Sequence, residues 1–256
     1  MAVPQGRAVV VVAHLTDADQ PLIPFLSVII PVYKDAEPLK KLLTDLKAIT
    51  SIICEVVVVD GSRDEDLKPL IEAFSNVRFI ESEPQRAGQM NAGAKHATGE
   101  VLWFLHADTR LPDTIMDVFL SFRKQTARVW GRFNVELDGN LKSLKLVAFM
   151  MNKRSAITSI ATGDQGFFVF SDTFMNIQGF PAQSLMEDIE FSKKLKSLSR
   201  PYIPKVRLTT SSRKWLSEGV FKTIRTMWYL RFIYWLGASP DLIHQLYYGA
   251  SKEKKS

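Results

Sequence analysis

Four short apolar runs in the first part of the chain predict strands. They cover residues 26–32, 54–60, 77–81 and 100–105. Each run is continuous and rich in β-branched residues, which is typical of strands buried on both faces of a sheet. We therefore expect these runs to form the centre of a parallel sheet.

Segments with helical spacing separate these runs. The first begins after Asp35, the expected N-cap, has Pro38 in its first turn, and repeats apolar residues three and four positions apart. These apolar residues are Leu39, Leu42, Leu43, Leu46 and Ile49. Further helices are expected over 65–74, over 87–97 and after Pro112. Alternating strands and helices predict an α/β fold with a mostly parallel sheet flanked by helices.

The pattern changes after residue 126. Residues 128–137 alternate as an antiparallel or edge strand would, 141–160 form a mixed helical stretch, and "GFFVF" at 166–170 predicts another strand. An amphipathic helix is expected over 187–198 and an aromatic helix over 219–237. We predict an N-terminal arm or extra strand over 1–25, one α/β domain over 26–215 and a helical extension, aromatic and basic, over 216–256.

Polar residues follow each of the predicted strands. The strand ends read Pro31-Val32-Tyr33, Asp60-Gly61-Ser62, Glu81 to Arg86, and His106-Ala107-Asp108. Open α/β sheets bind ligands at the carboxyl ends of their strands. The sequence therefore predicts a site along one edge of the sheet.

Composition excludes several classes of protein. The 256 residues are 46% hydrophobic, which is ample for a packed core. Cys54 is the only cysteine, so no disulfide can form within the chain, and a reducing, cytoplasmic compartment is expected. No Cys/His cluster has zinc spacing, no segment reaches the roughly 20 apolar residues of a membrane span, and "AVVVVAHL" near the start is too short for a signal-peptide core.

Positive charge is concentrated at the C-terminal end. Residues 192–256 carry 14 Lys/Arg against 3 Asp/Glu, within a net charge of +6 for the whole chain. Such a balance suggests contact with phosphates of a nucleotide, a lipid surface or a nucleic acid. Nucleic-acid binding has no motif support. The aromatic, basic helix either lies on an anionic membrane surface or packs across the domain, and the sequence leaves open whether copies of the chain associate into a homo-oligomer.

Taken in order, several motifs resemble family 2 glycosyltransferases of the inverting GT-A type. The resemblance spans about residues 26–198. It is carried by "SVIIPVYKDAEPLKKLL", "VVVVDGSRD", "QRAGQMNAGAKHATGEVLWFLHADTRLP", "TGDQGFFVF" and "MEDIEF". "SSRKW" at 211–215 looks like the tail of one bacterial subgroup, which has a His-Ala-Asp metal motif. The resemblance implies a GT-A, Rossmann-like domain and a hexosyltransferase-type enzyme that uses a nucleoside-diphosphate sugar.

The resemblance also assigns donor-binding residues. Asp60 matches the acid that accepts from the base or ribose, although this chain has Val59-Asp60 where many relatives have two acids. Tyr33 and Glu37 match the nucleoside pocket, or form a packing pair at the helix start. The complete expected donor set is Pro31, Tyr33, Glu37, Asp60, Arg86, Gln89, Asn91 and His106.

The end of the fourth strand is expected to hold the metal. The family usually has Asp-x-Asp here, and a carboxylate links Mn²⁺ or Mg²⁺ to the diphosphate; this chain has His106 and Asp108. Asp108 is the expected ligand, because hard cations favour oxygen and are often held by one or two carboxylates. His106 faces the donor, supplies a nitrogen ligand, or is a structural residue.

Catalytic roles follow from the later motifs. The family places its base in the Glu-Asp pair, so Asp188 is the expected base and Glu187 its orienting partner, although acids at a helix start also suit the helix dipole. Asp164 and Gln165 match the acceptor contact or pocket floor. Arg213, Lys214 and Trp215 are expected to form a lid over the diphosphate. The acceptor is an unidentified hydroxyl on a small molecule, a glycan or a lipid-linked compound.

Two other functions remain open at this level. A nucleotidyltransferase also binds nucleotides beside a metal, but "PVYKDAEPL" lacks the Gly-rich, basic loop such enzymes need. A sugar-nucleotide-binding protein without catalysis would explain the missing first acid. It would not require the Glu187-Asp188 pair.

Overall fold

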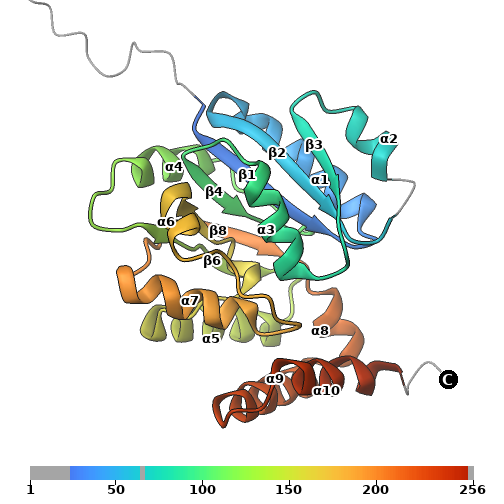
Figure 1. The fold of residues 1–256 in the computed structure, drawn as a ribbon. Coiled ribbons are helices and arrows are strands. Elements are labelled where there is room, and N and C mark those ends of the chain that lie inside the picture. The colour runs from blue at the N-terminus through green and yellow to red at the C-terminus, as the bar shows by residue number, and fades with distance from the viewer. Residues whose placement is uncertain (1–23, 64–66, 253–256) are drawn as a thin grey trace, which may run out of the picture.

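A six-stranded sheet forms the centre of the computed structural model, which describes residues 24–63 and 67–252. Its strand order is β3-β2-β1-β4-β7-β5 (Figure 1). The strands are β1 (Leu26–Val32), β2 (Ile53–Asp60), β3 (Val77–Glu81), β4 (Val101–Phe104), β5 (Trp130–Gly131) and β7 (Phe168–Phe170). β1 to β4 pair in parallel, and β7 runs antiparallel to β4 and β5. The predicted fold class and the four predicted parallel strands are confirmed.

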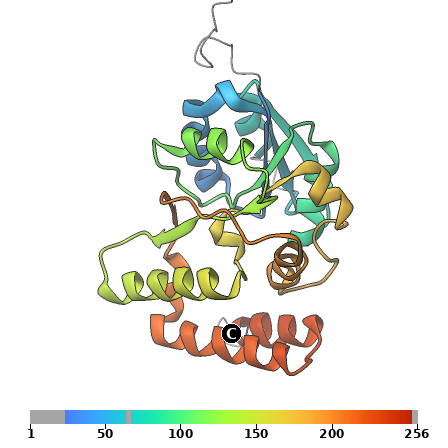
Figure 2. The same cartoon turned by 90° about the vertical axis from the view of Figure 1, so that its left-hand side faces the viewer.

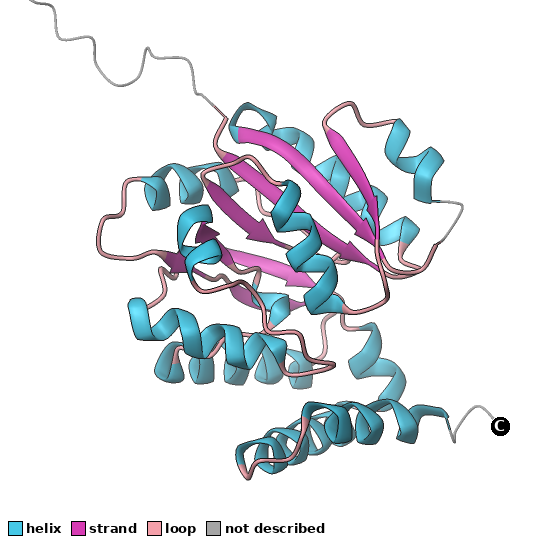
Figure 3. Cartoon of the chain, in the orientation of Figure 1, coloured by secondary structure: helices cyan, strands magenta, loops and turns pink. Residues whose placement is uncertain are grey.

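Helices cover both faces of the sheet (Figure 3). One face packs on α1 (Ala36–Leu46), α2 (Leu67–Glu72) and α4 (Ile115–Arg123), and the other on α3 (Arg86–His96), α6 (Ser171–Asn176) and α7 (Glu187–Leu198). Successive side chains of a strand point to opposite faces. Val28 and Ile30 accordingly join the first core, whereas Ile29 joins the second.

The alternating segment 128–137 does not form one strand. It divides into β5 at the edge of the large sheet and β6 (Asn134–Leu137), which pairs in parallel with β8 (Arg207–Thr210) in a second sheet. The chain leaves the large sheet at Arg132, whose fully buried guanidinium donates to the carbonyl oxygen of Phe133 at 3.0 Å and to Oδ1 of Asn134 at 2.6 Å. The backbone amides of Arg132 and Phe133 donate to the carbonyl oxygens of Tyr202 at 3.0 Å and Gln165 at 2.8 Å.

Two further expectations are corrected. Asp35 occupies the N-cap position of α1, but its side chain makes no capping hydrogen bond; its carboxylate instead accepts from Arg213 at 3.2 Å. β3 is only partly buried, because it is the edge strand and has a neighbour on one side alone.

Three further helical segments precede the C-terminal helices. They are the 3-10 turn η1 (Lys47–Ile52) after α1, α5 (Lys142–Thr158), and the 3-10 turn η2 (Gly163–Gln165) before β7. The chain then ends in α8 (Arg213–Glu218), α9 (Val220–Trp235) and α10 (Pro240–Lys252). Figure 2 shows α9 and α10 as a separate layer beyond α5 and α7.

The predicted segments differ in detail from the described helices. The predicted boundary between residues 215 and 216 falls inside α8. Helix α10 lies within the helical extension predicted over 216–256, of which only the helix over 219–237 was predicted individually. The predicted arm over 1–25 lies outside the described residues except for its last two. Within residues 24–63 and 67–252, no helix is both long and apolar enough to cross a membrane.

Candidate active site

The parallel register brings the polar strand ends to one edge. Val32 at the end of β1 pairs with Asp60 at the end of β2, and Asp60 pairs with Glu81 at the end of β3. The amide of Gly61 donates to the carbonyl oxygen of Val32 at 3.0 Å, which fixes the turn after β2. The polar strand ends therefore lie along one edge of the sheet, where the sequence predicts a site.

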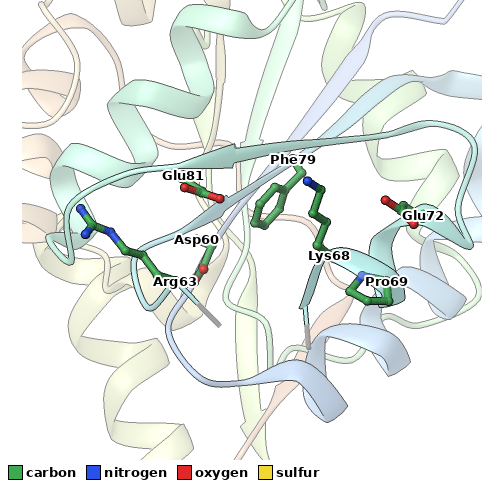
Figure 4. Close-up of a pocket in the computed structure, with 7 residues that line it drawn as sticks. All are labelled: Asp60, Arg63, Lys68, Pro69, Glu72, Phe79 and Glu81. Carbon is green, nitrogen blue, oxygen red and sulfur yellow. The ribbon is translucent and has the colours of Figure 1, made fainter. Parts of the chain in front are cut away.

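A cavity of about 270 Å³ lies at this edge, between β2, β3 and α2 (Figure 4). Oδ1 of Asp60 accepts from the amide of Ser62 at 2.8 Å and from its hydroxyl at 2.5 Å. The lining of the cavity combines acids with an aromatic ring and two cations, a chemistry that fits a nucleoside. The lining residues are Asp60, Arg63, Lys68, Pro69, Glu72, Phe79 and Glu81.

Sequence reasoning missed most of this lining. Lys68 and Phe79 come from α2 and from the edge strand β3, where an isolated lysine or phenylalanine carries no recognisable signal. Pro31, Tyr33 and Glu37 do not belong to the lining. Tyr33 is 55% exposed just beyond β1, Pro31 pairs with Val59 inside the sheet, and Glu37 lies in the first turn of α1.

Gln89 has a structural role that was not predicted. It is 4% exposed, and its amide nitrogen donates to the carbonyl oxygens of Val32 at 2.9 Å and Val59 at 2.8 Å. The side chain thus joins the ends of β1 and β2 from within α3, and its donors are not open to a ligand.

The side chain of Asn91 likewise makes its hydrogen bonds to the backbone. Its amide donates to the carbonyl oxygen of Phe180 at 2.8 Å, and its oxygen accepts from the amide of Phe180 at 3.0 Å. This two-way contact holds the segment before α7 against α3. The predicted donor contacts of Gln89 and Asn91 are replaced by backbone contacts, because both side chains point inward from α3.

Gln89→Leu is expected to lower the free energy of unfolding by about 1–3 kcal/mol, because the carbonyl oxygens of Val32 and Val59 each lose one hydrogen bond in a buried site. Urea unfolding followed by circular dichroism measures this change. Gln125→Leu is the control, since that half-buried amide makes only a 3.4 Å hydrogen bond to Ser121, and its effect should stay within about 0.5 kcal/mol. Equal effects of the two substitutions would contradict the structural role of Gln89.

His106 lies in a fixed pair with Asp164. Its Nδ1 is 3.1 Å from Oδ1 of Asp164, and because a carboxylate can only accept, Nδ1 carries the proton. Its Nε2 is buried and has no hydrogen-bond partner among residues 24–63 and 67–252, and a Cβ on Gly163 would lie 2.5 Å from that atom. Neither ring nitrogen is open to a metal ion or to the sugar donor, so the structure favours a structural role for His106.

Asp164 explains why a histidine is tolerated at position 106. Burial raises the pKa of the Asp164 carboxyl, but the hydrogen bond and charge of His106, with the charges of Arg86 and Lys214, lower the pKa below its usual value. An acid at position 106 would face this carboxylate and repel it. Gln165, expected on the pocket floor, is fully buried, and its side-chain oxygen accepts from the amide of Thr162 at 3.1 Å.

Asp108 remains available at the end of β4. Its side chain is 28% exposed, and Oδ2 lies 3.8 Å from the Arg213 guanidinium. Burial raises the pKa of its carboxyl; His106 and Arg213 oppose this, whereas the like charges of Asp164 and Asp35 add to it. The carboxylate oxygens of Asp108 are hard donors of the kind that a divalent cation prefers.

The protein alone does not complete a metal shell here. Within residues 24–63 and 67–252, no group of three or more His, Cys, Asp or Glu side chains could hold a metal ion. A Mg²⁺- or Mn²⁺-type site often uses one or two carboxylates together with substrate phosphates and water. Asp108 fits that arrangement as the protein ligand.

Glu187 and Asp188 open α7 at the same edge. Met186 precedes them with φ 65° and ψ 17°, a left-handed conformation that a non-glycine residue rarely adopts. Burial raises the pKa of both carboxyls, and the like charge of Asp188 raises the pKa of Glu187 further. A raised pKa suits a group that must take up a proton near neutral pH.

Arginines surround this acid pair. The charges of Arg231, Arg86 and Arg154 lower the pKa of Asp188, and Arg86 acts in the same direction on Glu187 and Asp164. Arg86 is exposed at the start of α3, so it can also meet an anionic ligand. Arg231 and Arg154 were missed, because α9 and α5 are distant in sequence and carry no motif.

Arg154 is a buried cation with little direct pairing. Its Nε and Nη2 have no hydrogen-bond partner, and Nη1 makes only a 3.3 Å contact to the carbonyl oxygen of Ile160. Burial, followed by the charge of Arg231, lowers its pKa to about 10, while Asp188 opposes this. The guanidinium therefore stays charged at pH 7 and favours the ionised form of Asp188.

The three predicted lid residues lie in α8 and differ in role. Arg213 bridges Asp35 at 3.2 Å and Asp108 at 3.8 Å. The Lys214 ammonium sits 3.7 Å from the ring centre of Tyr247, and its charge acts on Asp164. Trp215 packs against the cluster of Leu137, Leu144 and Val147, so it anchors α8.

The residues converge on a common chemistry. Asp108, Asp164, Glu187 and Asp188 provide acids with perturbed pKa values, and Arg86, Lys214 and Arg213 provide positive charge at the same edge as the Asp60 cavity. Such a set can bind a charged diphosphate and remove a proton from a nearby hydroxyl.

Comparisons with known proteins point to one family. Residues 27–175 match the family described as Glycosyl transferase family 2. An uncharacterised glycosyltransferase of Mycobacterium tuberculosis is 28% identical over 153 residues, which are 57% of this chain and 58% of that protein. The matched part of the chain thus spans under two thirds of that relative's length.

Solved structures share the fold. The mannosyltransferase PcManGT from Pyrobaculum calidifontis, in complex with GDP-Man and Mn²⁺, aligns with a TM-score of 0.62 at 18% identity, covering 87% of this chain and 70% of that chain. TarS of S. aureus in complex with UDP-GlcNAc aligns with a TM-score of 0.59 at 20% identity, covering 74% of this chain and 59% of that chain.

Proposed function

The chain belongs to glycosyl transferase family 2, and from this premise we propose that it transfers a sugar, with inversion, from a nucleoside-diphosphate sugar to an acceptor hydroxyl. The observation that carries the proposal is the Glu187–Asp188 pair. Burial raises the pKa of both carboxyls, and the pair is electrostatically linked through Arg86 to Asp164 at the edge that holds Asp108.

The donor is proposed to lie along the sheet edge. Its nucleoside occupies the cavity beside Asp60, where Phe79 offers an aromatic wall and Asp60 and Glu81 offer acceptors. Its diphosphate extends toward Asp108, with Arg86, Lys214 and Arg213 as the nearby cations. GDP-Man and UDP-GlcNAc in the complexes of the two structural neighbours support a nucleotide-sugar donor.

A divalent cation is proposed at Asp108. When bound, Mn²⁺ or Mg²⁺ supplies positive charge that stabilises the departing diphosphate. Asp108 is the carboxylate that would hold it. The Arg213 guanidinium, 3.8 Å from Oδ2 of Asp108, would add a second positive charge beside the diphosphate. Mn²⁺ in the mannosyltransferase complex supports this assignment.

Asp188 is proposed as the general base. Its carboxylate takes the proton from the acceptor hydroxyl, whose oxygen attacks the anomeric carbon while the bond to the diphosphate oxygen breaks on the opposite side. Glu187 holds the acceptor or the base in place. Arg231, Arg86 and Arg154 keep Asp188 ionised often enough to act, because each lowers its pKa.

A donor-binding screen tests this function. Thermal unfolding is measured with UDP-, GDP- and dTDP-sugars, each with Mn²⁺, with Mg²⁺ or with EDTA. A donor at about 100 times its Kd should add about 2.7 kcal/mol to the stability of the folded state, a shift of several degrees, and the shift at the same donor concentration should be clearly smaller with EDTA than with metal. The same nucleosides without phosphates are the control. No shift with any donor would contradict the proposal, and a shift without any turnover would favour a binding protein.

A further inference from the structure

Helix α9 has two opposite apolar faces, and the described part of the chain covers only one of them. Thr223 and Leu230 are 1% exposed and face the body of the protein. On the other side, Phe221 is 81%, Trp228 62%, Phe232 57% and Trp235 77% exposed. These four rings occupy positions i, i+7, i+11 and i+14, so they form one stripe along the helix. We call these four residues the outer stripe.

The covered side of α9 is tied to the body, so the stripe is not a product of a loose helix. Leu230 and Ile243 of α10 form one buried cluster with Met186, which directly precedes the Glu187–Asp188 pair. The Tyr234 hydroxyl donates to Glu190 at 2.6 Å, and the Ser184 hydroxyl donates to Asp241 at 2.7 Å. The hairpin formed by α9 and α10 therefore has a fixed orientation on the body of the protein, and the outer stripe faces away from the sheet.

Exposed apolar residues continue beside the stripe. Five further large side chains of α9, α10 and the residue after α9 are at least 40% exposed: Tyr229, Leu236, Leu242, Leu246 and Tyr248. A cavity of about 320 Å³ lies between the two helices and is lined by Arg225, Thr226, Tyr229, Leu230 and Leu246. Contiguous exposed apolar surface of this kind marks a binding surface.

The charge beside the stripe is positive. α9 contains Lys222, Arg225 and Arg231 and no acid, and Lys222 and Arg225 are exposed. The only acid within α10 is Asp241, which accepts from Ser184 on the body. A surface of aromatic rings bordered by cations complements the headgroup region of an anionic bilayer.

A second copy of the chain fits this surface less well. A two-fold contact between two stripes would bring Lys222 and Arg225 of both copies together, and α9 offers no acid to match them. Anionic lipid supplies the missing negative charge, and tryptophan and tyrosine favour the depth where headgroups meet acyl chains.

We propose that α9, through its outer stripe and with α10 beside it, is a docking surface for a membrane rich in anionic phospholipid. The helix lies in the plane of the interface with its rings inserted and Lys222 and Arg225 among the headgroups. Because Met186 touches the covered face of α9, docking places the Glu187–Asp188 edge next to the bilayer. This surface is separate from the donor site and does not depend on the proposed function.

Vesicle flotation of the full chain tests the proposal without donor or metal. Vesicles of equal parts phosphatidylglycerol and phosphatidylcholine are compared with phosphatidylcholine alone. The full chain should float with the anionic vesicles and bind them about tenfold or more tightly than the neutral ones, and high salt should weaken that binding. Failure to float with anionic vesicles would overturn the proposal and leave the donor-binding screen unaffected.

Matched variants locate the surface. Trp228→Ser/Trp235→Ser should weaken binding to anionic vesicles by about tenfold or more, because two inserted rings are lost. Ile157→Ser/Leu198→Ser is the control, since these side chains are 82% and 55% exposed on α5 and α7, and it should bind like the unaltered chain. Thermal unfolding should be the same in both variants. Equal binding by the stripe variant, or a dimer that this variant dissociates, would overturn the proposal.

Discussion

Asp188→Asn is expected to lower the turnover number for sugar transfer by about 10²- to 10⁴-fold, the usual contribution of a positioned general base. Asparagine preserves the size of the side chain but cannot take the proton of the acceptor hydroxyl. Donor affinity should change little, because the proposed donor contacts lie at Asp60, Asp108 and Arg86. Steady-state kinetics and donor titration together separate the two effects.

Glu190→Gln is the matched control for this substitution. It removes one negative charge from the same turn of α7, at a residue that contacts Lys193 and Tyr234 and not the proposed donor. The control should retain most of its turnover. If Asp188→Asn retained transfer as well as this control does, Asp188 would not be the base.

The pH dependence of turnover should report the same group. Burial raises the pKa of Asp188 above that of an ordinary aspartate near 4. The charged base is the active form, so activity should fall as the pH drops through this raised pKa, and the acid limb should lie above pH 4. Arg231, Arg86 and Arg154 oppose this shift, because the charge of each lowers the pKa of Asp188.

Asp108→Ala is expected to make donor binding insensitive to Mn²⁺ and Mg²⁺ and to lower kcat/KM by about 10²-fold or more. The substitution removes the carboxylate that would hold the cation and leaves the nucleoside cavity beside Asp60 intact. Residual, metal-independent donor binding should therefore remain. Calorimetric titration of the donor with and without metal measures both the residual donor affinity and its dependence on metal.

Asp113→Ala provides the comparison for Asp108→Ala. Asp113 is an exposed acid five residues further along the chain, before α4, and its removal should leave the metal response unchanged. A metal response that survives in Asp108→Ala would place the cation elsewhere or exclude it from donor binding.

The sequence predicted the elements well because their signals are local. The continuous β-branched runs of β1 and β2 and the leucine spacing of α1 depend on neighbours in the chain, and each element formed where expected. The division of 128–137 was not predictable in this way. It depends on burial of Arg132 and on pairing with β8, which lies more than 70 residues later.

The candidate site was predictable where its residues form motifs. Asp60, Asp108 and the Glu187–Asp188 pair follow strands or open a helix, and the fold brings them to one edge. Gln89 and Asn91 have the residue types of donor contacts, but their orientation on α3 turns them toward backbone groups. Orientation about a helix is set by packing and cannot be read from residue type alone.

Arg154 and Arg231 show a different limit. Their importance comes from the charge they bring to Asp188, Arg154 from α5 and Arg231 from α9. The proximity of Arg231 exists only once α9 has packed beside the start of α7. The role of His106 likewise depended on Asp164 and on the small size of Gly163. Pairings between distant segments are what the fold adds to the sequence.

The stereochemistry of turnover tests the central proposal most directly. With the donor that the screen identifies, slow hydrolysis in the absence of acceptor is followed by proton NMR, and the first anomer of the released sugar is recorded. An α-linked donor should give the β anomer first in the unaltered protein, and Asp188→Asn should release almost none. Release of the α anomer first, or no release from any donor with either metal, would contradict inverting glycosyl transfer at this site.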